Sequence, residues 1–221
     1  MGGRAVRPRR WRGIAAAAVG LLLIGFAGAL YLGREPAVTA AAVGTVPALA
    51  PGVVGVPVEP GDLRPGAPLH VRAPGIVPTA LELPARGIGA PVVPVGTAPD
   101  GALVVPDPPR TVGWWAPGAL AGSGTGTVVV AGHVDSRVAG IGTLAVLPEL
   151  TVGEPVVLTG ADGRAVRYRV VARREFAKAA LPADTFARTG PPRLVLVTCG
   201  GRFDPGTRSY EDNIVVYAEP V

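Results

Sequence analysis

The chain has 221 residues and a net charge of +5, which is enough for one domain of ordinary size with attachments. Residues 1–34 carry six Arg and no acidic residue, so 15 of the 21 basic residues and all 16 acidic residues fall in 35–221. A protein that neutralises nucleic-acid phosphates needs a basic face on its folded part. The charge distribution therefore excludes the nucleic-acid-binding class, and we expect no nucleic-acid partner.

The first predicted element is a membrane anchor at residues 14–32, nineteen residues without a charge. At about 1.5 Å per residue, a helix of this length nearly spans a hydrocarbon core of about 30 Å. Because the Arg-rich tail at 1–13 precedes it, the positive-inside rule predicts a single pass through the cell membrane, with the tail cytoplasmic and the following chain extracellular. The alternative is a cleaved signal peptide, with small-residue sites at 27–29 or 39–41. The stretch is longer than the apolar region of a signal peptide, about 7–15 residues, and this favours an uncleaved anchor.

Residues 33–77 form the next segment, which is rich in Pro, Ala, Val and Gly and has no sustained helical or strand period. Chains of this composition are extended and semi-rigid. We predict a spacer that separates the anchor from a folded domain. His70 lies in this segment and is interpreted as an ordinary linker residue.

Residues 78–221 are predicted to form a mostly β domain, because short apolar runs alternate with turn signals. The predicted strands are 81–88, 90–95, 102–105, 126–133, 155–158, 165–176, 193–199 and 213–218. The sequence ADGR at 161–164 signals a hairpin, and 141–150 and 182–187 are each long enough for a short helix. Gly and Pro at the joints favour a small closed β-barrel with one or two short helices.

The chain has a single Cys, Cys199, at the end of the apolar run RLVLVTC and directly before Gly200 and Gly201. An extracellular Cys could form a disulfide, but this one has no partner. A buried structural thiol is the common alternative for a free Cys. A strand that stops at the Cys and opens into two glycines would place the sulfur at a sheet edge beside a flexible loop, and this favours a nucleophile.

A thiol needs help to ionise near neutral pH, because its free pKa is about 8.5. His133, the one His of 78–221, ends the apolar run GTVVVAGH, so it lies at a strand end as Cys199 does. A lone His is often structural, but the pairing of a sole His with a sole Cys favours catalysis. Acyl transfer also needs positive charge for the oxyanion. Arg202 and Arg208 are candidates, although a solvated surface charge is the ordinary interpretation of either.

These motifs resemble the sortase family, and most closely the class F sortases of actinobacteria. VVVAGHVDS, LVLVTCGG and TRSYEDNIVVYAE occur in that order, and the resemblance covers about 78–221. The family's T-L-x-T-C signature appears as VLVTC, with one position changed, and VGWWAPGALAGSGTG at 112–126 also resembles the subclass. The resemblance implies an eight-stranded sortase barrel with a Cys–His–Arg site. Many relatives carry Arg directly after the Tyr of the last motif, where this chain has Glu211. We therefore assign the role of the site Arg to Arg208, and Arg202 is the alternative.

The activity that the resemblance implies is cleavage of an LPxTG-type sorting signal between Thr and Gly by a membrane-anchored cysteine transpeptidase. Cys199 would form a thioacyl intermediate, His133 would serve as acid and base, Arg208 would contact the oxyanion, and Thr198 would help to shape the site. The implied partners are sorting-signal proteins and an amine of a peptidoglycan precursor, or water. We expect no cofactor and no metal, because the sequence has no G-x-G-x-x-G, P-loop or helix-spaced metal motif.

Two other enzyme classes use a Cys and a His. L,D-transpeptidases usually hold both in one short motif, whereas 66 residues separate them here, and papain-like peptidases place the Cys before the His. The non-enzymatic alternative is an exported β-domain with a buried structural thiol, acting as a wall-binding or scaffold module.

Overall fold

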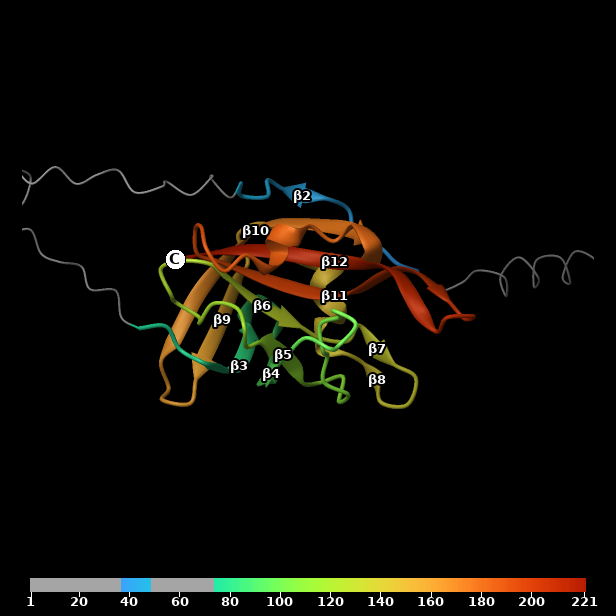
Figure 1. Cartoon of the computed structure of the whole chain (residues 1–221), viewed down its shortest axis with the longest axis horizontal. Coiled ribbons are helices and arrows are strands. Elements are labelled where there is room, and N and C mark those ends of the chain that lie inside the picture. The colour runs from blue at the N-terminus through green and yellow to red at the C-terminus, as the bar shows by residue number, and fades with distance from the viewer. Residues whose placement is uncertain (1–36, 49–73) are drawn as a thin grey trace, which may run out of the picture. The chain divides into compact units, whose positions relative to one another are not determined.

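The computed structural model describes residues 37–48 and 74–221 (Figure 1). The predicted anchor at 14–32 and His70 lie outside the described residues. Within the described ranges, no helix is long and apolar enough to cross a membrane.

Eight strands close into a barrel, as predicted. Each strand is hydrogen-bonded to the next in the order β11, β12, β10, β9, β3, β4, β5 and β6, and a parallel pairing between β6 and β11 completes the ring. The strands are β3 (Pro78–Leu83), β4 (Ile88–Val95), β5 (Val112–Trp115), β6 (Thr127–Ala131), β9 (Pro155–Gly160), β10 (Ala165–Ala177), β11 (Arg193–Asp204) and β12 (Ser209–Pro220).

Two predicted strands differ from the observed ones. The run 81–88 is interrupted by the 3₁₀ turn η1 (Pro84–Arg86), which ends at Gly87 with a φ of 61°. The run 102–105 is no strand and makes one isolated bridge, between Thr97 and Leu103. It lies close to Pro106, Pro108 and Pro109, and Pro has no N–H to donate to a sheet.

The eighth barrel strand is instead β5, in the segment VGWW, which was not predicted as a strand. All four of its residues are buried, and it pairs with β4 in parallel and with β6 antiparallel. A strand covered on both faces has no polar–apolar alternation, and four residues are too few to show another period.

The two predicted short helices are 3₁₀ turns. These are η2 (Thr143–Glu149), which buries Leu144 and Leu147, and η4 (Ala183–Phe186). Another short turn, η3 (Lys178–Ala180), follows β10, and a small hairpin of β7 (Asp135–Ser136) and β8 (Gly140–Ile141) follows β6.

Two apolar clusters cover the two faces of β6 and β11. Val128 and Val130 point into the barrel interior with Leu194 and Leu196. Their neighbours point outward into a second cluster under the surrounding loops; these are Val129, Ala131, Val195 and Val197. Each buried Val or Leu contributes about 1.5–3 kcal/mol of hydrophobic stabilisation. The continuous apolar runs in the sequence therefore reflect strands that are buried on both faces.

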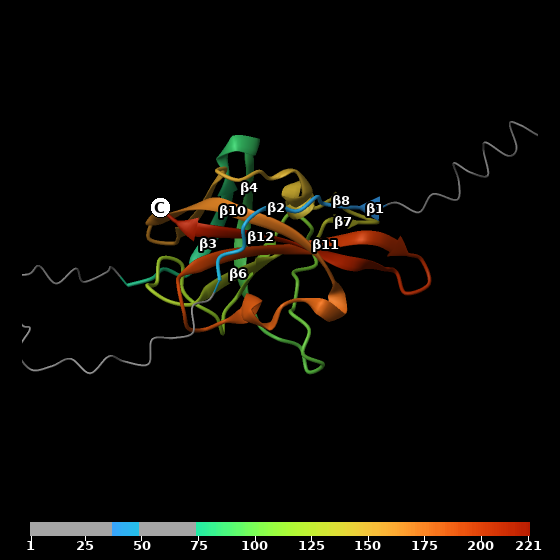
Figure 2. The same cartoon turned by 90° about the horizontal axis from the view of Figure 1, so that it is seen from above.

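Part of the segment predicted as a spacer pairs with the barrel. β1 (Ala37–Val38) pairs with β11, and β2 (Val43–Gly44) pairs with β10 (Figure 2). The guanidinium groups of Arg173 and Arg174 donate hydrogen bonds to carbonyl oxygens of this segment, at Ala41, Val43 and Gly44. Residues 37–48 thus lie along the outside of the β10 and β11 sheet.

Candidate active site

Cys199 and His133 lie at the same level of neighbouring strands. The last β6–β11 pair is Ala131 with Val197, and each candidate residue follows its strand's member of that pair by two positions. The Thr198 hydroxyl donates a hydrogen bond of 2.8 Å to the Gly132 carbonyl, and the Gly132 amide donates one of 3.1 Å to the Val197 carbonyl. These bonds fasten the residue after the end of β6 to the middle of β11.

Strand alternation places the Cys199 side chain on the outer face of the barrel, whereas His133 follows the end of β6. Side chains at positions i and i+2 of a strand share a face. Cys199 therefore shares the face of Val195 and Val197, which belong to the outer cluster.

The strand that carries Cys199 does not end there, which corrects the predicted loop opening. β11 continues to Asp204 through a bulge between Gly200 and Phe203. Gly201 has a φ of 79°, and a Cβ atom there would lie 2.2 Å from a carboxylate oxygen of Asp212. A Cβ on Gly200 would lie 2.6 Å from the Ile214 side chain. The two glycines are thus required by a close approach of β12.

A cavity of 540 Å³ contains three of the sequence-predicted residues, namely Cys199, His133 and Arg208. Arg208 lies in the turn between β11 and β12 with a φ of 54°, the one positive φ outside glycine in the described chain. Asp204 shapes this turn by accepting hydrogen bonds of 2.8 Å from the Gly206 amide and the Thr207 hydroxyl. Arg202 does not line the cavity and pairs with Ala37 of β1.

Five further polar residues line this cavity and were not predicted from the sequence: Asp135, Ser136, Arg137, Ser209 and Tyr210. The Tyr210 hydroxyl donates a 2.8 Å hydrogen bond to Asp135, and the Tyr210 ring packs edge-on against Phe203. Burial, followed by the hydrogen bond to Asp135, raises the pKa of Tyr210 to about 12. Asp135 begins β7, two positions after His133, and strand periodicity gave no signal for it because residues 132–134 are not in a strand.

The surroundings of Cys199 favour the protonated thiol. Burial raises the pKa of the thiol, the nearby Lys178 ammonium lowers it, and the Asp135 carboxylate raises it. Uncompensated burial disfavours the charged form of an acidic group. In the free protein the sulfur is therefore mainly a thiol near neutral pH, and nucleophilic attack requires a base to accept its proton.

A second, apolar cavity of 440 Å³ meets the first at Cys199. Its wall combines the 101–105 segment, the middle of β11 and the turns after β10. Lys178 lines it together with the apolar side chains Leu103, Val105, Val197, Leu181 and Phe186. Phe186 packs edge-on against Trp115 of β5, at a centroid distance of 5.1 Å. The sulfur thus lies where a cavity lined by His133, Asp135 and two arginines meets one lined mainly by apolar side chains.

No metal centre is present among residues 37–48 and 74–221, where no group of three or more His, Cys, Asp or Glu residues is placed to hold an ion.

The fold and cavity define a closed β-barrel protein with a thiol and an imidazole that line the same surface cavity. A family model described as the sortase domain matches residues 81–221, and the chain therefore belongs to the sortase family. This confirms the predicted family. We found no curated protein with significant sequence similarity to the chain.

Solved sortases share the fold at low sequence identity. Sortase C1 of Streptococcus agalactiae, in complex with MTSET, has a TM-score of 0.51 and 19% identity over 65% of this chain and 69% of that chain. A lid mutant of sortase A from Corynebacterium diphtheriae has a TM-score of 0.50 and 20% identity, over 68% and 73%. Sortase C1 from Streptococcus suis has a TM-score of 0.52 and 14% identity, over 66% and 74%.

Proposed function

We propose that this sortase is a cysteine transpeptidase that cleaves an LPxTG-type sorting signal between Thr and Gly. The observation that carries the proposal is the convergence of Cys199, His133 and Arg208 on one cavity. The motifs at these positions also support assignment to class F.

In the first half of the proposed reaction, the Cys199 sulfur attacks the Thr carbonyl carbon and passes its proton to His133. A C–S bond forms, and Arg208 donates hydrogen bonds to the negative oxygen of the tetrahedral intermediate. The C–N bond then breaks, and His133 returns the proton to the leaving Gly amine. The product is a thioacyl enzyme.

In the second half, an acceptor amine gives a proton to His133 and attacks the thioacyl carbon. A new C–N bond forms, the C–S bond breaks, and the Cys199 thiol is regenerated. Water in place of the amine gives hydrolysis. The high thiol pKa fits this scheme, because the site needs an acid and base rather than a permanent thiolate.

The two cavities suggest which side of the substrate lies where. We assign the apolar cavity to the Leu and Pro side chains of the sorting signal, because burial of apolar surface contributes about 25 cal/mol per Å². The cavity with His133 and Arg208 then holds the oxyanion and the amine that leaves or enters.

We further propose that residues 14–32 anchor the enzyme in the cell membrane, with the barrel outside the cell. A substrate held in the same membrane would meet the enzyme at a raised effective concentration. The acceptor would be an amine of a peptidoglycan precursor, so the product would be a protein attached to the cell wall.

The experiment that tests this function uses the full chain in detergent, an LPxTG peptide, a peptide of scrambled order and a simple amine. We expect cleavage of the LPxTG peptide between Thr and Gly and, with the amine present, an amide product detected by mass. His133→Ala should lower kcat/KM about 10²–10⁴-fold, the usual contribution of an acid–base group. Equal cleavage of the scrambled peptide, or a loss below about tenfold in the variant, would contradict the proposal.

A further inference from the structure

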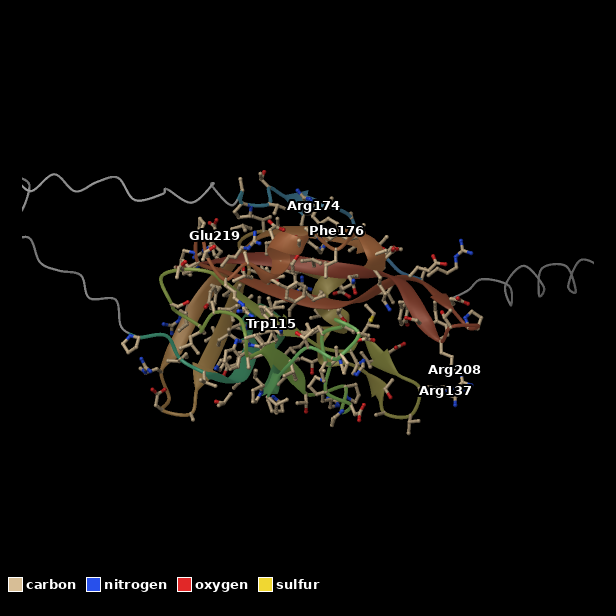
Figure 3. The ribbon with its side chains drawn as sticks, viewed as in Figure 1. Trp115, Arg137, Arg174, Phe176, Arg208 and Glu219 are labelled. Carbon is tan, nitrogen blue, oxygen red and sulfur yellow. The ribbon has the colours of Figure 1, made fainter. Side chains whose placement is uncertain are left out.

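Two arginines face the same cavity from different hairpins. Arg137 lies between β7 and β8, and Arg208 lies between β11 and β12; both line the cavity that contains Cys199. In the view of Figure 3, both side chains lie at the same end of the molecule. The ion pairs of the described chain involve Arg86, Arg164 and Arg193, so neither cavity arginine has a carboxylate partner there.

The one carboxylate that lines this cavity belongs to Asp135, which accepts the Tyr210 hydroxyl hydrogen bond. The cavity wall therefore presents two guanidinium groups against one acidic group. Both arginines are solvent-exposed, so water screens their mutual repulsion, and an anion bound between them is attracted by both. The left-handed backbone of Arg208 adds a cost on the order of 1 kcal/mol that an Asn or Gly would largely avoid.

A carboxylate is the anion that this pair fits by chemistry and by place. The planar fork of Arg matches the two oxygens of a carboxylate, and the resulting hydrogen bonds are strengthened by charge. The acyl part of the substrate is assigned to the apolar cavity, so the arginine cavity lies on the amine side. The leaving amine and the entering amine use this side in turn.

We propose that Arg137, together with Arg208, binds a carboxylate carried by the amine-side reactant, either the entering acceptor or the segment that leaves after Gly. This inference rests on the proposed function for the identity of the ligand. The existence of the anion site can be tested without turnover.

The first test compares two alkylating reagents at Cys199, iodoacetate and its neutral analogue iodoacetamide. Both form a C–S bond with the same sulfur, release iodide and leave the thiol proton to solvent. The ratio of their rate constants is therefore independent of the thiol pKa. In the full-length wild type we expect the rate constant for iodoacetate, divided by that for iodoacetamide, to be about five times the same ratio for free glutathione. High salt should reduce this excess.

The variant Arg137→Gln should lower the reagent ratio about threefold. Arg167→Gln is the matched control, because Arg167 is an exposed residue of β10 that does not line the cavity, and it should keep the wild-type ratio. A wild-type ratio equal to that of glutathione, or one that Arg137→Gln leaves unchanged, would overturn the anion site.

The second test identifies which reactant carries the carboxylate. Diglycine and diglycine amide are compared as acceptors by their KM, and LPxTG peptides with Glu or Gln after the Gly are compared as substrates. A preference for the carboxylate-bearing compound that is lost in Arg137→Gln supports the proposal. If the acceptors show this preference, the carboxylate belongs to the entering amine; if the substrate peptides show it, the carboxylate belongs to the leaving segment. Turnover without a preference in either arm would overturn the amine-side assignment. If no peptide reacts, the proposed function fails while the reagent ratio still decides the anion site.

Discussion

At the scale of single residues, the site consists of groups that modify one another's charge. Cys199 is half-buried, and its thiol has a raised pKa, with Lys178 and Asp135 acting in opposite directions. Tyr210 fixes Asp135 through its hydroxyl. The charge balance around the sulfur is therefore set by side chains from η3, the β7–β8 hairpin and β12.

The pH dependence of Cys199 alkylation follows from these charges. Because burial and Asp135 both disfavour the thiolate, the midpoint of the iodoacetamide rate profile should lie above the free value of about 8.5. Asp135→Asn removes a negative charge and should lower the midpoint, whereas Lys178→Gln removes a positive charge and should raise it. Shifts in the same direction for both variants would contradict the electrostatic account.

The two candidate arginines can be separated by matched variants. Arg208→Gln should lower kcat/KM for an LPxTG peptide by about 10²-fold or more, the usual cost of losing an oxyanion donor. Arg202→Gln should stay within about twofold of the wild type, because Arg202 does not line the cavity. A larger loss of kcat/KM for Arg202→Gln than for Arg208→Gln would assign the oxyanion contact to Arg202 instead.

At the scale of elements, the bulge of β11 positions the strand beyond Cys199. Gly201→Ala should destabilise the fold by about 2–4 kcal/mol, since its Cβ would meet the Asp212 carboxylate and the residue holds a positive φ. Gly163→Ala is the control, with a φ of 78° and nothing within 4 Å of the added Cβ. It should cost about 1 kcal/mol. If urea unfolding gave the same loss of unfolding free energy for both variants, the close approach of Asp212 would not contribute to the cost of Gly201→Ala.

The elements that were predictable from the sequence have long apolar runs. The runs of β6, β10 and β11 were located because their Val and Leu residues are continuous or closely spaced, and Cys199 and His133 were found at the ends of two of them. β5 was missed because four buried residues show no alternation, and 102–105 was mistaken for a strand because its nearby prolines were given too little weight.

Several cavity residues could not be predicted, because they become neighbours through loops. Arg137 and Arg208 are 71 residues apart in the sequence and line the same cavity from two different hairpins. Arg208 was selected by its place before the last strand. The left-handed backbone of Arg208 depends on the turn between β11 and β12. Arg202 lies outside the cavity and pairs with β1. Patterns in a single sequence reveal neither feature.

At the scale of the whole molecule, the barrel has a pH-sensitive link between distant segments. Arg86 of η1 donates hydrogen bonds of 2.9 and 2.7 Å to Glu154, which precedes β9, and this contact lowers the pKa of Glu154 to about 2. A lowered carboxyl pKa stabilises the folded state above the unfolded pKa of about 4.3. That stability is lost as the pH falls toward 2.

We therefore expect the free energy of unfolding to fall between about pH 4.5 and pH 2, with Glu154 contributing on the order of 2 kcal/mol. Glu154→Gln should be less stable than the wild type at pH 7 and should show a flatter decline in this window. Urea unfolding at several pH values measures both quantities. A parallel decline in the two proteins would show that Glu154 does not carry the effect.

The central claim, that Cys199 is the nucleophile, is tested most directly by intact-mass analysis of the full chain quenched in acid during turnover of an LPxTG peptide. We predict a mass increase equal to the peptide's acyl part, located on Cys199 by peptide mapping and released by hydroxylamine, and no adduct on Cys199→Ala. An adduct on a different residue, or cleavage that persists in Cys199→Ala, would contradict the account.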